Sequence, residues 1–588
     1  MKSRKLIAVI LVLAMMAVLA LTACGDKTST NQGAENPDNA AAAPGDAGQN
    51  SQAPGNAGQN SQAPGNANQG SPEQAPAGDF SIGQSALDYA DFVKSEIRPG
   101  ATSSKDTFTF AAVRDPGMIV TWALRDLTFY PLSTAAQQYF MLYDYDIGDY
   151  FSPVLDKYEP DPDFMGVTFF IKPGIKMHDG GTFGPYDIIM SIQAFRDHNA
   201  MGWQLDFVDL EDAKIIDDTT LYLPFNRLNG VWASGFEMLT VISGAAYEAA
   251  GRDVSFYKKP VGPMPYIIKE WISGESITLE RFDDYFMGTP PIKTIKMLII
   301  SDRTAAFMAL QNGDIDLLWN ISADQVKTAY ASDDLELIMT GRNMSIFMGM
   351  NSGNSALSDL RVREAIFRAI NRDDIIKGAY DGLATPAYSI LTPEGIGYNK
   401  DYETNSPFPE YNIQKAKELL AEAGYGNGLT LRILAESMIN FQLVVEQLSG
   451  QLAEVGITLE PTLTDSASVN TLLAGTDPSA YDLFLFVAKA SGESISTVDN
   501  RELFGASHPE LSADGSGAKY ADLWDNVRSK PDVNERAQAY KDVQAFFFDS
   551  GLYWVPLAVS QTYIGLDKDL TGIRIIGFQG FFAGAYFR

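Results

Sequence analysis

Histidine is the side chain best suited to proton transfer and metal binding near neutral pH, and this 588-residue chain contains three. They are His178, His198 and His508, and no two of them have the spacing of a metal-binding pair. A segment starting at Asp161 begins like a calcium loop, but its twelfth position is Lys172 instead of glutamate. We therefore predict no metal site and no bound cofactor.

Motifs for nucleophilic or phosphate chemistry are also missing from the sequence. There is no G-x-S-x-G elbow, no H-E-x-x-H motif and no G-x-x-x-x-G-K-[ST] loop. The acid pairs Asp217-Asp218 and Asp373-Asp374 are more typical of turns and helix starts than of a glycosidase couple. We predict that the protein is not an enzyme; a secreted hydrolase is the disfavoured alternative.

The single cysteine, Cys24, follows an uncharged apolar segment, Leu6–Leu21, which three basic residues precede. This layout is that of a secretory signal peptide, here residues 1–23. The sequence Leu21-Thr-Ala-Cys24 resembles the bacterial lipobox, in which the cysteine sulfur is acylated and becomes the first residue of the mature protein. We expect a lipid anchor on Cys24 that holds the protein on the outer side of a cell membrane.

The composition limits the possible partners. The chain carries 44 basic and 74 acidic residues, a formal net charge of −30. Nucleic acid is therefore excluded as an expected partner, because phosphate binding needs clustered Lys and Arg. With 45% hydrophobic and 11% aromatic residues the chain can bury a large core. At this length we predict two or three lobes and a monomer.

A low-complexity tether is predicted over residues 24–104. Within it, Gly25–Asp79 has no Val, Ile, Leu, Met, Phe, Tyr or Trp, and a ten-residue repeat starts at Pro44, Pro54 and Pro64. A segment with nothing to bury is expected to stay disordered. As a flexible coil, the segment Gly25–Asp79 of about 55 residues would have its ends roughly 40 Å apart. We interpret it as a spacer between the membrane and the folded body.

Strand-like and helix-like patterns are mixed through the rest of the chain. Residues 107–113, 168–172 and 220–225 alternate like strands. Helices are predicted over 413–423, with Asn412 as N-cap, and over about 440–455, followed by a strand at Ile457. Repeated strand–helix–strand passages predict an α/β lobe between residues 340 and 550.

Several of these segments, in this order, resemble the extracytoplasmic solute-binding proteins of oligopeptide, dipeptide and nickel ABC importers. The most diagnostic block consists of Met350-Asn351, Leu357–Ile366 and Ala369–Arg372, and Ala309–Asp316 matches a family motif almost letter for letter. The other matching segments are Phe169–Ile188, Ile216–Leu223, Val261–Trp271 and Lys415–Tyr425. In Val261–Trp271 the family's Thr and second Gly are replaced by Pro263 and Met264.

The resemblance implies an α/β fold of the two-lobed periplasmic-binding-protein type (type II, cluster C) with an extra small domain. Lobe I would comprise residues 105–133, 246–335 and 551–588. The extra domain would cover 134–245 and lobe II 336–550. On helical spacing, a helix capped by Ser358 or Asp359 should turn its apolar face inward, and Asn371 should cap the next helix. Arg361 and Arg363 are then expected to form surface or interlobe ion pairs.

The same resemblance implies a mechanism and a set of ligand residues. The lobes close over a solute that both of them contact, and the closed form docks on permease subunits in the membrane. Aromatic side chains are expected in the cleft walls, and Asn351 is expected near the lobe junction. Tyr388, Lys489 and Ser491 lie in segments that border the ligand in relatives. The predicted ligand-binding residues are Trp319, Asn351, Tyr388, Phe486, Lys489, Ser491 and Trp554.

The solute itself stays open at this stage. Peptide-binding relatives continue after the strand at 481–486 with W-x-x-D-Y-x-D-P, in which an Asp pairs with the peptide's amino terminus. Here Lys489 replaces that anion, and Glu493 is the nearest carboxylate. Peptide therefore shares the prediction with an oligosaccharide or an anionic solute; a nickel chelate is disfavoured. A sensor or adhesion lipoprotein with the same fold is the alternative from another functional class.

Overall fold

The computed structural model describes most of the chain beyond residue 102. The described residues are 103–120, 127–144, 149–198, 202–340, 344–351, 353–389, 391–437, 439–474, 480–489, 516–549, 551, 553–576 and 579–588. The tether at 24–104, apart from its last two residues, therefore lies outside the described residues, as do Cys24 and Ser491.

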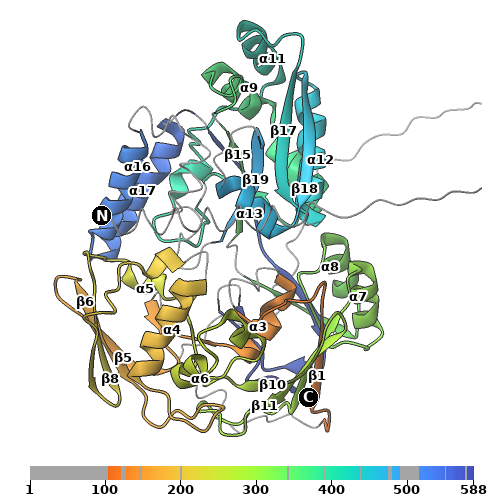
Figure 1. The fold of residues 1–588 in the computed structure, drawn as a ribbon. Helices are drawn as coiled ribbons and strands as arrows, with labels where there is room; N and C mark the ends of the chain where they lie inside the picture. Colours follow the sequence, from red (N-terminus) through yellow and green to blue (C-terminus); the bar gives the residue numbers. More distant parts are fainter. Residues whose placement is uncertain are drawn as a thin grey trace, which may run out of the picture. The chain divides into compact units, whose positions relative to one another are not determined.

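Lobe I is built on a seven-stranded mixed sheet, in the order β10-β11-β12-β1-β13-β21-β14 (Figure 1). The strands are β1 Thr107–Ala112, β10 Tyr266–Ile272, β11 Ser276–Arg281, β12 Thr294–Ile299, β13 Leu317–Trp319, β14 Leu335–Met339 and β21 Tyr563–Asp567. Side chains alternate across it as the strand period requires. Phe108 and Phe110 pack in one core, whereas Ala111 packs in the core on the opposite face.

Helices cover both faces of this sheet. α7 (Arg303–Gln311) and α8 (Ala323–Tyr330) contribute to the core that contains Ala111. α3 (Tyr130–Ala136) contributes to the core that contains Phe108. Short strand pairs and one helix complete this region: β2 Gln138–Tyr139 with β9 Thr240–Val241, β22 Leu570–Thr571 with β25 Tyr586–Phe587, β23 Arg574–Ile576 with β24 Gln579–Phe581, and α6 Gly244–Ala249.

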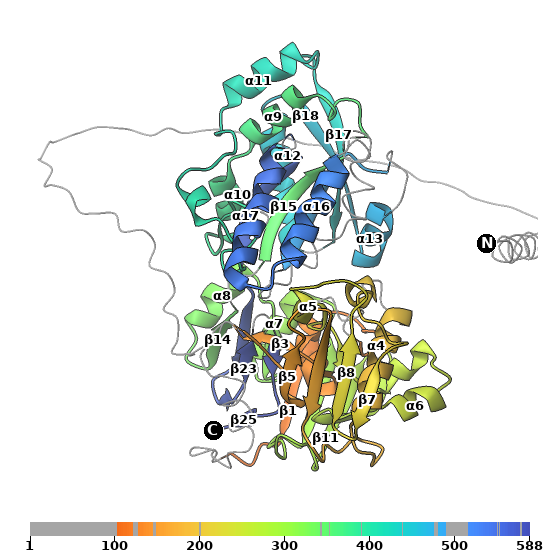
Figure 2. The same cartoon turned by 90° about the vertical axis from the view of Figure 1, so that its left-hand side faces the viewer.

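A separate four-stranded antiparallel sheet, in the order β5-β6-β8-β7, occupies the range predicted for the extra domain. Figure 2 shows β5, β8 and β7 next to α4. The elements are β3 Leu142–Asp144, β4 Asp149–Phe151, β5 Leu155–Pro160, β6 Gly166–Ile171, β7 Lys214–Asp217, β8 Thr220–Pro224, α4 Pro185–His198 and α5 Trp232–Gly235. Phe169, Ile192 and Phe236 belong to its own hydrophobic core.

Lobe II has a six-stranded mixed sheet, in the order β16-β20-β15-β19-β17-β18. Its strands are β15 Met344–Met350, β16 Thr385–Pro386, β17 Leu429–Glu436, β18 Ile457–Thr464, β19 Leu483–Lys489 and β20 Trp554–Ser560. Its helices are α9 Leu360–Ala369, α10 Arg372–Tyr380, α11 Ile413–Glu422, α12 Ile439–Ala453, α13 Ser466–Ala474, α16 Ser516–Arg528 and α17 Val533–Asp549. The pair α16 and α17 lies side by side in both views (Figures 1 and 2).

Local signals read from the sequence set the starts of three of these helices. Asp359, Asn371 and Asn412 each accept a backbone N–H bond from the first turn of α9, α10 and α11. Such caps satisfy donors that have no partner within the helix. The predicted caps at these helix starts are confirmed, with Asp359 rather than Ser358 as the cap of α9.

The sheets assign two strands differently from the predicted lobe boundaries. β14, at 335–339, pairs with β21 in the lobe I sheet, although lobe II was expected from residue 336. β20 pairs with β15 in the lobe II sheet, although lobe I was expected to resume at residue 551. The chain therefore passes between the sheets at 340–344 and again at 560–563. Hydrophobic patterning cannot reveal this, because a buried strand looks alike in either sheet.

Candidate functional site

Two segments carry the chain between the lobes, and they are hydrogen-bonded to each other. The N–H of Thr340 donates to the carbonyl of Thr562 at 3.0 Å. The N–H of Thr562 donates to Oγ1 of Thr340, also at 3.0 Å. Both threonines are buried. This crossing joins the lobe I sheet to the lobe II sheet.

Strand register shows which end of the lobe II sheet adjoins the crossing. Met344, the first residue of β15, lies opposite Lys489 at the end of β19 and opposite Ser560 at the end of β20. Met344 packs in the lobe I core, and Val487 packs against the cores of both lobes. The end of β19 therefore lies at the lobe junction. The backbone of Lys489 is placed there, while its side chain lies outside the described residues.

The same register corrects the expected position of Asn351. It follows the last residue of β15, so it lies at the end of the strand opposite the crossing, about 23 Å away at the rise of a β-strand. Its side chain is buried, donating to the carbonyl of Tyr481 at 3.0 Å and accepting from the N–H of Gly353 at 2.9 Å. Asn351 closes a turn in lobe II instead of bordering the junction.

Beside Asn351, an ion pair fixes the start of β19. Arg432 donates to both carboxylate oxygens of Asp482, at 2.8 and 3.0 Å. Burial raises the pKa of Asp482, but the hydrogen bonds from Arg432 and from Asn354 outweigh it, so the net pKa lies below its usual range. This carboxylate therefore stays ionised near neutral pH and has a structural role.

Two of the predicted aromatic ligand residues, Trp554 and Phe486, lie close together in lobe II. Trp554 lies opposite Gly349, toward the same remote end of the sheet, and its ring contacts Phe347 at a centroid distance of 4.8 Å. Phe347 also contacts Phe486, at 5.8 Å, so the structure brings Trp554 and Phe486 into one aromatic cluster. Trp554 is buried, whereas Phe486 is half-buried.

Trp319 lies in the other lobe, apart from that cluster. It ends β13 opposite Ile564, the residue that follows the crossing segment, and its side chain is completely buried. Tyr130 and Phe582 pack against its ring. Among the described residues its indole N–H has no hydrogen-bond partner. Trp319 and Trp554 are therefore core residues in this structure, and Phe486 and Lys489 stay as predicted ligand residues.

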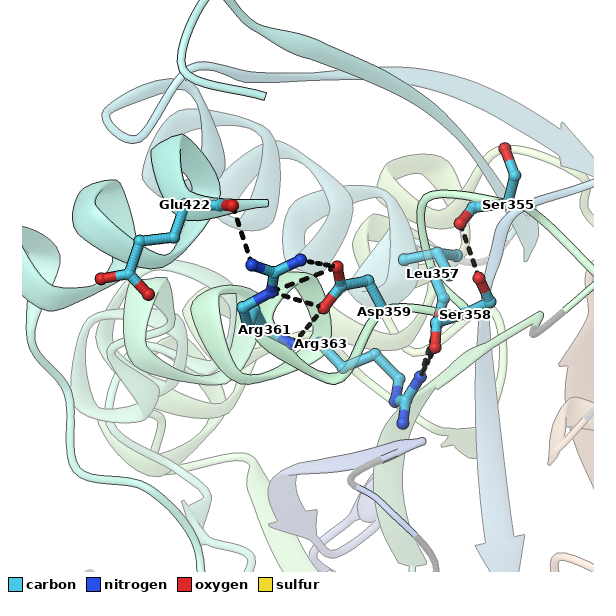
Figure 3. A network of polar contacts seen from close by, with 7 residues as sticks. All are labelled: Ser355, Leu357, Ser358, Asp359, Arg361, Arg363 and Glu422. Carbon is cyan, nitrogen blue, oxygen red and sulfur yellow. Dashed lines mark hydrogen bonds and ion pairs between the residues drawn. The ribbon is translucent and has the colours of Figure 1, made fainter. Parts of the chain in front are cut away.

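The two arginines of the most diagnostic sequence segment have different environments (Figure 3). Arg361 forms the expected surface ion pair, with Asp359, and also donates to the carbonyl of Glu422 at 2.8 Å. Arg363 is buried and donates to the carbonyls of Gly551, Leu357 and Ser358, with its guanidinium 4.0 Å from the Tyr553 ring centroid. Arg363 thus fastens the segment before β20 to the start of α9.

Tyr388 lies elsewhere in lobe II, beside a pocket of about 180 Å³. The pocket is lined by Phe367, Ile370, Asn371, Arg372, Asp373, Pro386, Tyr388, Pro409, Tyr411, Val555 and Pro556. The guanidinium of Arg372 lies 5.3 Å from the Tyr388 ring centroid. Sequence analysis missed Arg372; the only signal was its place in the Asn371-Arg372 pair that opens α10.

Metal-binding geometry is not found in the part of the chain that the structure describes, where no group of three His, Cys, Asp or Glu side chains could hold an ion. His178 packs against Phe282, and its Nε2 lies 2.9 Å from the carbonyl of Met264. Burial lowers the pKa of His178. Within the described ranges no helix is long and apolar enough to cross a bilayer.

Comparison with known proteins decides the family. The profile of bacterial extracellular solute-binding proteins, family 5, matches residues 151–495, which is more than half of the chain. The chain belongs to this family. Its members are solute-binding proteins, and the two-lobed α/β fold predicted for the chain is confirmed.

Curated relatives and solved structures agree with this family. The glutathione-binding protein GsiB of Escherichia coli K12 is 28% identical over 434 residues, covering 71% of this chain and 82% of GsiB. GsiB of Pectobacterium atrosepticum is 27% identical, covering 72% and 82%. DppA of Helicobacter pylori, solved with the peptide STSA, has a TM-score of 0.69 at 20% identity, covering 82% of this chain and 98% of DppA. CtaP of Listeria monocytogenes has a TM-score of 0.69 at 21% identity, covering 82% and 100%.

Proposed function

We propose that this protein is the lipid-anchored receptor of an ABC importer, and that it captures a short peptide-like solute by closure of its lobes. The observation that carries the proposal is the family match over residues 151–495. Relatives in this family are named for glutathione or were solved with peptides, which share a peptide backbone and terminal charges. The captured solute would be passed to permease subunits in the membrane.

The geometry of the crossing supports closure as the mode of capture. Two segments joined by the Thr340 and Thr562 hydrogen bonds connect the lobes, so a solute contacting both lobes can shift the angle between them. Lys489, whose backbone ends β19 at this junction, would supply a cation for a solute carboxylate. A neutral oligosaccharide has no carboxylate to pair with that cation, so we favour the peptide-like solute.

A thermal-shift screen of the mature chain tests the proposal. The probes are glutathione, a dipeptide, a longer oligopeptide, an oligosaccharide and a nickel–histidine complex. A true solute at about one hundred times its dissociation constant should stabilise the protein by about 2.7 kcal/mol. Stabilisation by the oligosaccharide alone would replace the peptide-like assignment, and turnover of any probe would contradict the receptor role.

Small-angle X-ray scattering then tests the mechanism with the probe that stabilises most. We expect the radius of gyration to decrease on saturation, because closure brings the lobes together. A solute that binds without any such decrease would contradict capture by closure.

A further inference from the structure

The Arg372 pocket contains a cation without a counter-ion. Among the described residues, no carboxylate lies within ion-pair distance of Arg372. Within the same residues its guanidinium donates one hydrogen bond, to the carbonyl of Ala387 at 2.6 Å. Arg372 also lines the pocket, where its guanidinium lies 5.3 Å from the Tyr388 ring centroid. The side chain is half-buried, and burial lowers the pKa of Arg372. A desolvated charge in a protein is normally paired, so this environment is incomplete without an anion.

Both walls of the pocket are held in place by hydrogen bonds. On one side, the N–H of Ala387 bonds to the carbonyl of Leu557, and Ser389 is bonded to Ser345 and Gln544. Arg372 itself is positioned by the start of α10, where Asn371 is the cap.

On the opposite side, the guanidinium of Arg368 in α9 donates to the carbonyl of Glu410, and the backbone carbonyl of Arg368 accepts from the N–H of Asn412. Phe367 stacks on Phe408 at 5.1 Å. These bonds hold Pro409 and Tyr411 at the pocket wall. The pocket is therefore preformed, as small-molecule sites usually are.

We propose that this pocket is a second binding site, separate from the lobe junction, that takes a small organic solute through its carboxylate. Arg372 pairs with the carboxylate, and the proline and tyrosine side chains of the lining contact the rest of the solute. A monoanion fits better than a dianion because Arg372 is the sole cation lining the pocket and the charge of Asp373 acts on it.

The register places this site away from the crossing. Val555 and Pro556 lie opposite Met348 and Phe347, four or more residues along β20 from Ser560. Every lining residue belongs to lobe II. A solute that contacts one lobe alone does not favour the closed arrangement, so occupancy of this pocket should leave lobe closure unchanged.

Site-specific chemical protection tests the proposal on the mature chain. Phenylglyoxal modifies accessible arginines, and mass spectrometry reports the rate at Arg372 separately from the ion-paired Arg361, which serves as internal control. The probe is N-acetylalanine, compared at equal ionic strength with its uncharged amide and with inorganic phosphate. At saturation N-acetylalanine should slow modification of Arg372 by about threefold or more, with Arg361 unchanged.

Three outcomes would overturn the proposal. They are equal protection by the amide, protection by phosphate in place of N-acetylalanine, and no protection at all. A second measurement uses the rise in Tm caused by N-acetylalanine relative to its amide, which R372Q should abolish and R361Q should retain. K489A separates this site from the junction: protection of Arg372 should persist in K489A whether or not the proposed receptor function holds.

Discussion

At the scale of single residues, Arg363 and Arg361 show how similar positions in one helix acquire different roles. Both belong to α9, yet Arg363 is buried among three carbonyls and Arg361 is at the surface. A Cβ at Gly551 would lie 2.8 Å from a guanidinium nitrogen of Arg363, so the guanidinium would have to move. The φ of Gly551 is +105°, a conformation that residues with a side chain rarely adopt, which favours glycine at this position.

The R363A variant should therefore be destabilised by about 3 kcal/mol, since three buried carbonyl groups lose their donors. R361A is the matched control and should change stability little, because an exposed ion pair contributes little. Urea denaturation of the mature chain measures both. Equal stability of the two variants would contradict the structural role of Arg363.

Lys489 carries the prediction for solute recognition at this scale. If its ammonium pairs with a solute carboxylate, K489A should weaken binding of the solute found by screening by about tenfold or more. Lys417, exposed on α11, provides the control, and K417A should bind like the unchanged protein. Isothermal titration calorimetry measures both affinities. Unchanged affinity in K489A would remove Lys489 from the site.

At the scale of elements, the crossing segments offer a matched pair of nearly isosteric substitutions. Oγ1 of Thr340 accepts the N–H of Thr562, whereas Oγ1 of Thr562 is buried without a partner among the described residues. T340V should lose about 2 kcal/mol of stability, because the buried N–H of Thr562 loses its acceptor. T562V should be neutral or stabilising. Thermal unfolding measures both, and a loss in T562V as large as in T340V would show that the hydroxyl of Thr340 is not what matters.

Register within the elements also decided which predicted site residues can act together. Lys489 and Asn351 are both predicted as ligand residues from the family resemblance, yet they lie at opposite ends of the β15–β19 pair. Only a residue at the Met344 end adjoins the crossing. Sequence separation carries no information on this point, because antiparallel strands place chain-distant residues opposite one another.

At the scale of the whole molecule, the proposed anchor determines where the receptor works. We expect C24S to incorporate no lipid, because the thiol that would be acylated is gone. Labelling of cells that express either form with radioactive palmitate measures the incorporation. Binding of the solute should be unchanged in C24S, and label on this variant would contradict the lipid anchor.

By itself, the sequence determined the family, the two-lobed α/β class and the caps of α9, α10 and α11, because these depend on local patterns and motifs. Tertiary structure decided the assignment of β14 and β20 to their sheets, the burial of Trp319 and Arg363, and the Arg372 pocket. Each of these depends on which distant strands pair and which side chains they bring into contact. Hydrophobic periodicity marks a face as buried but does not say what covers it.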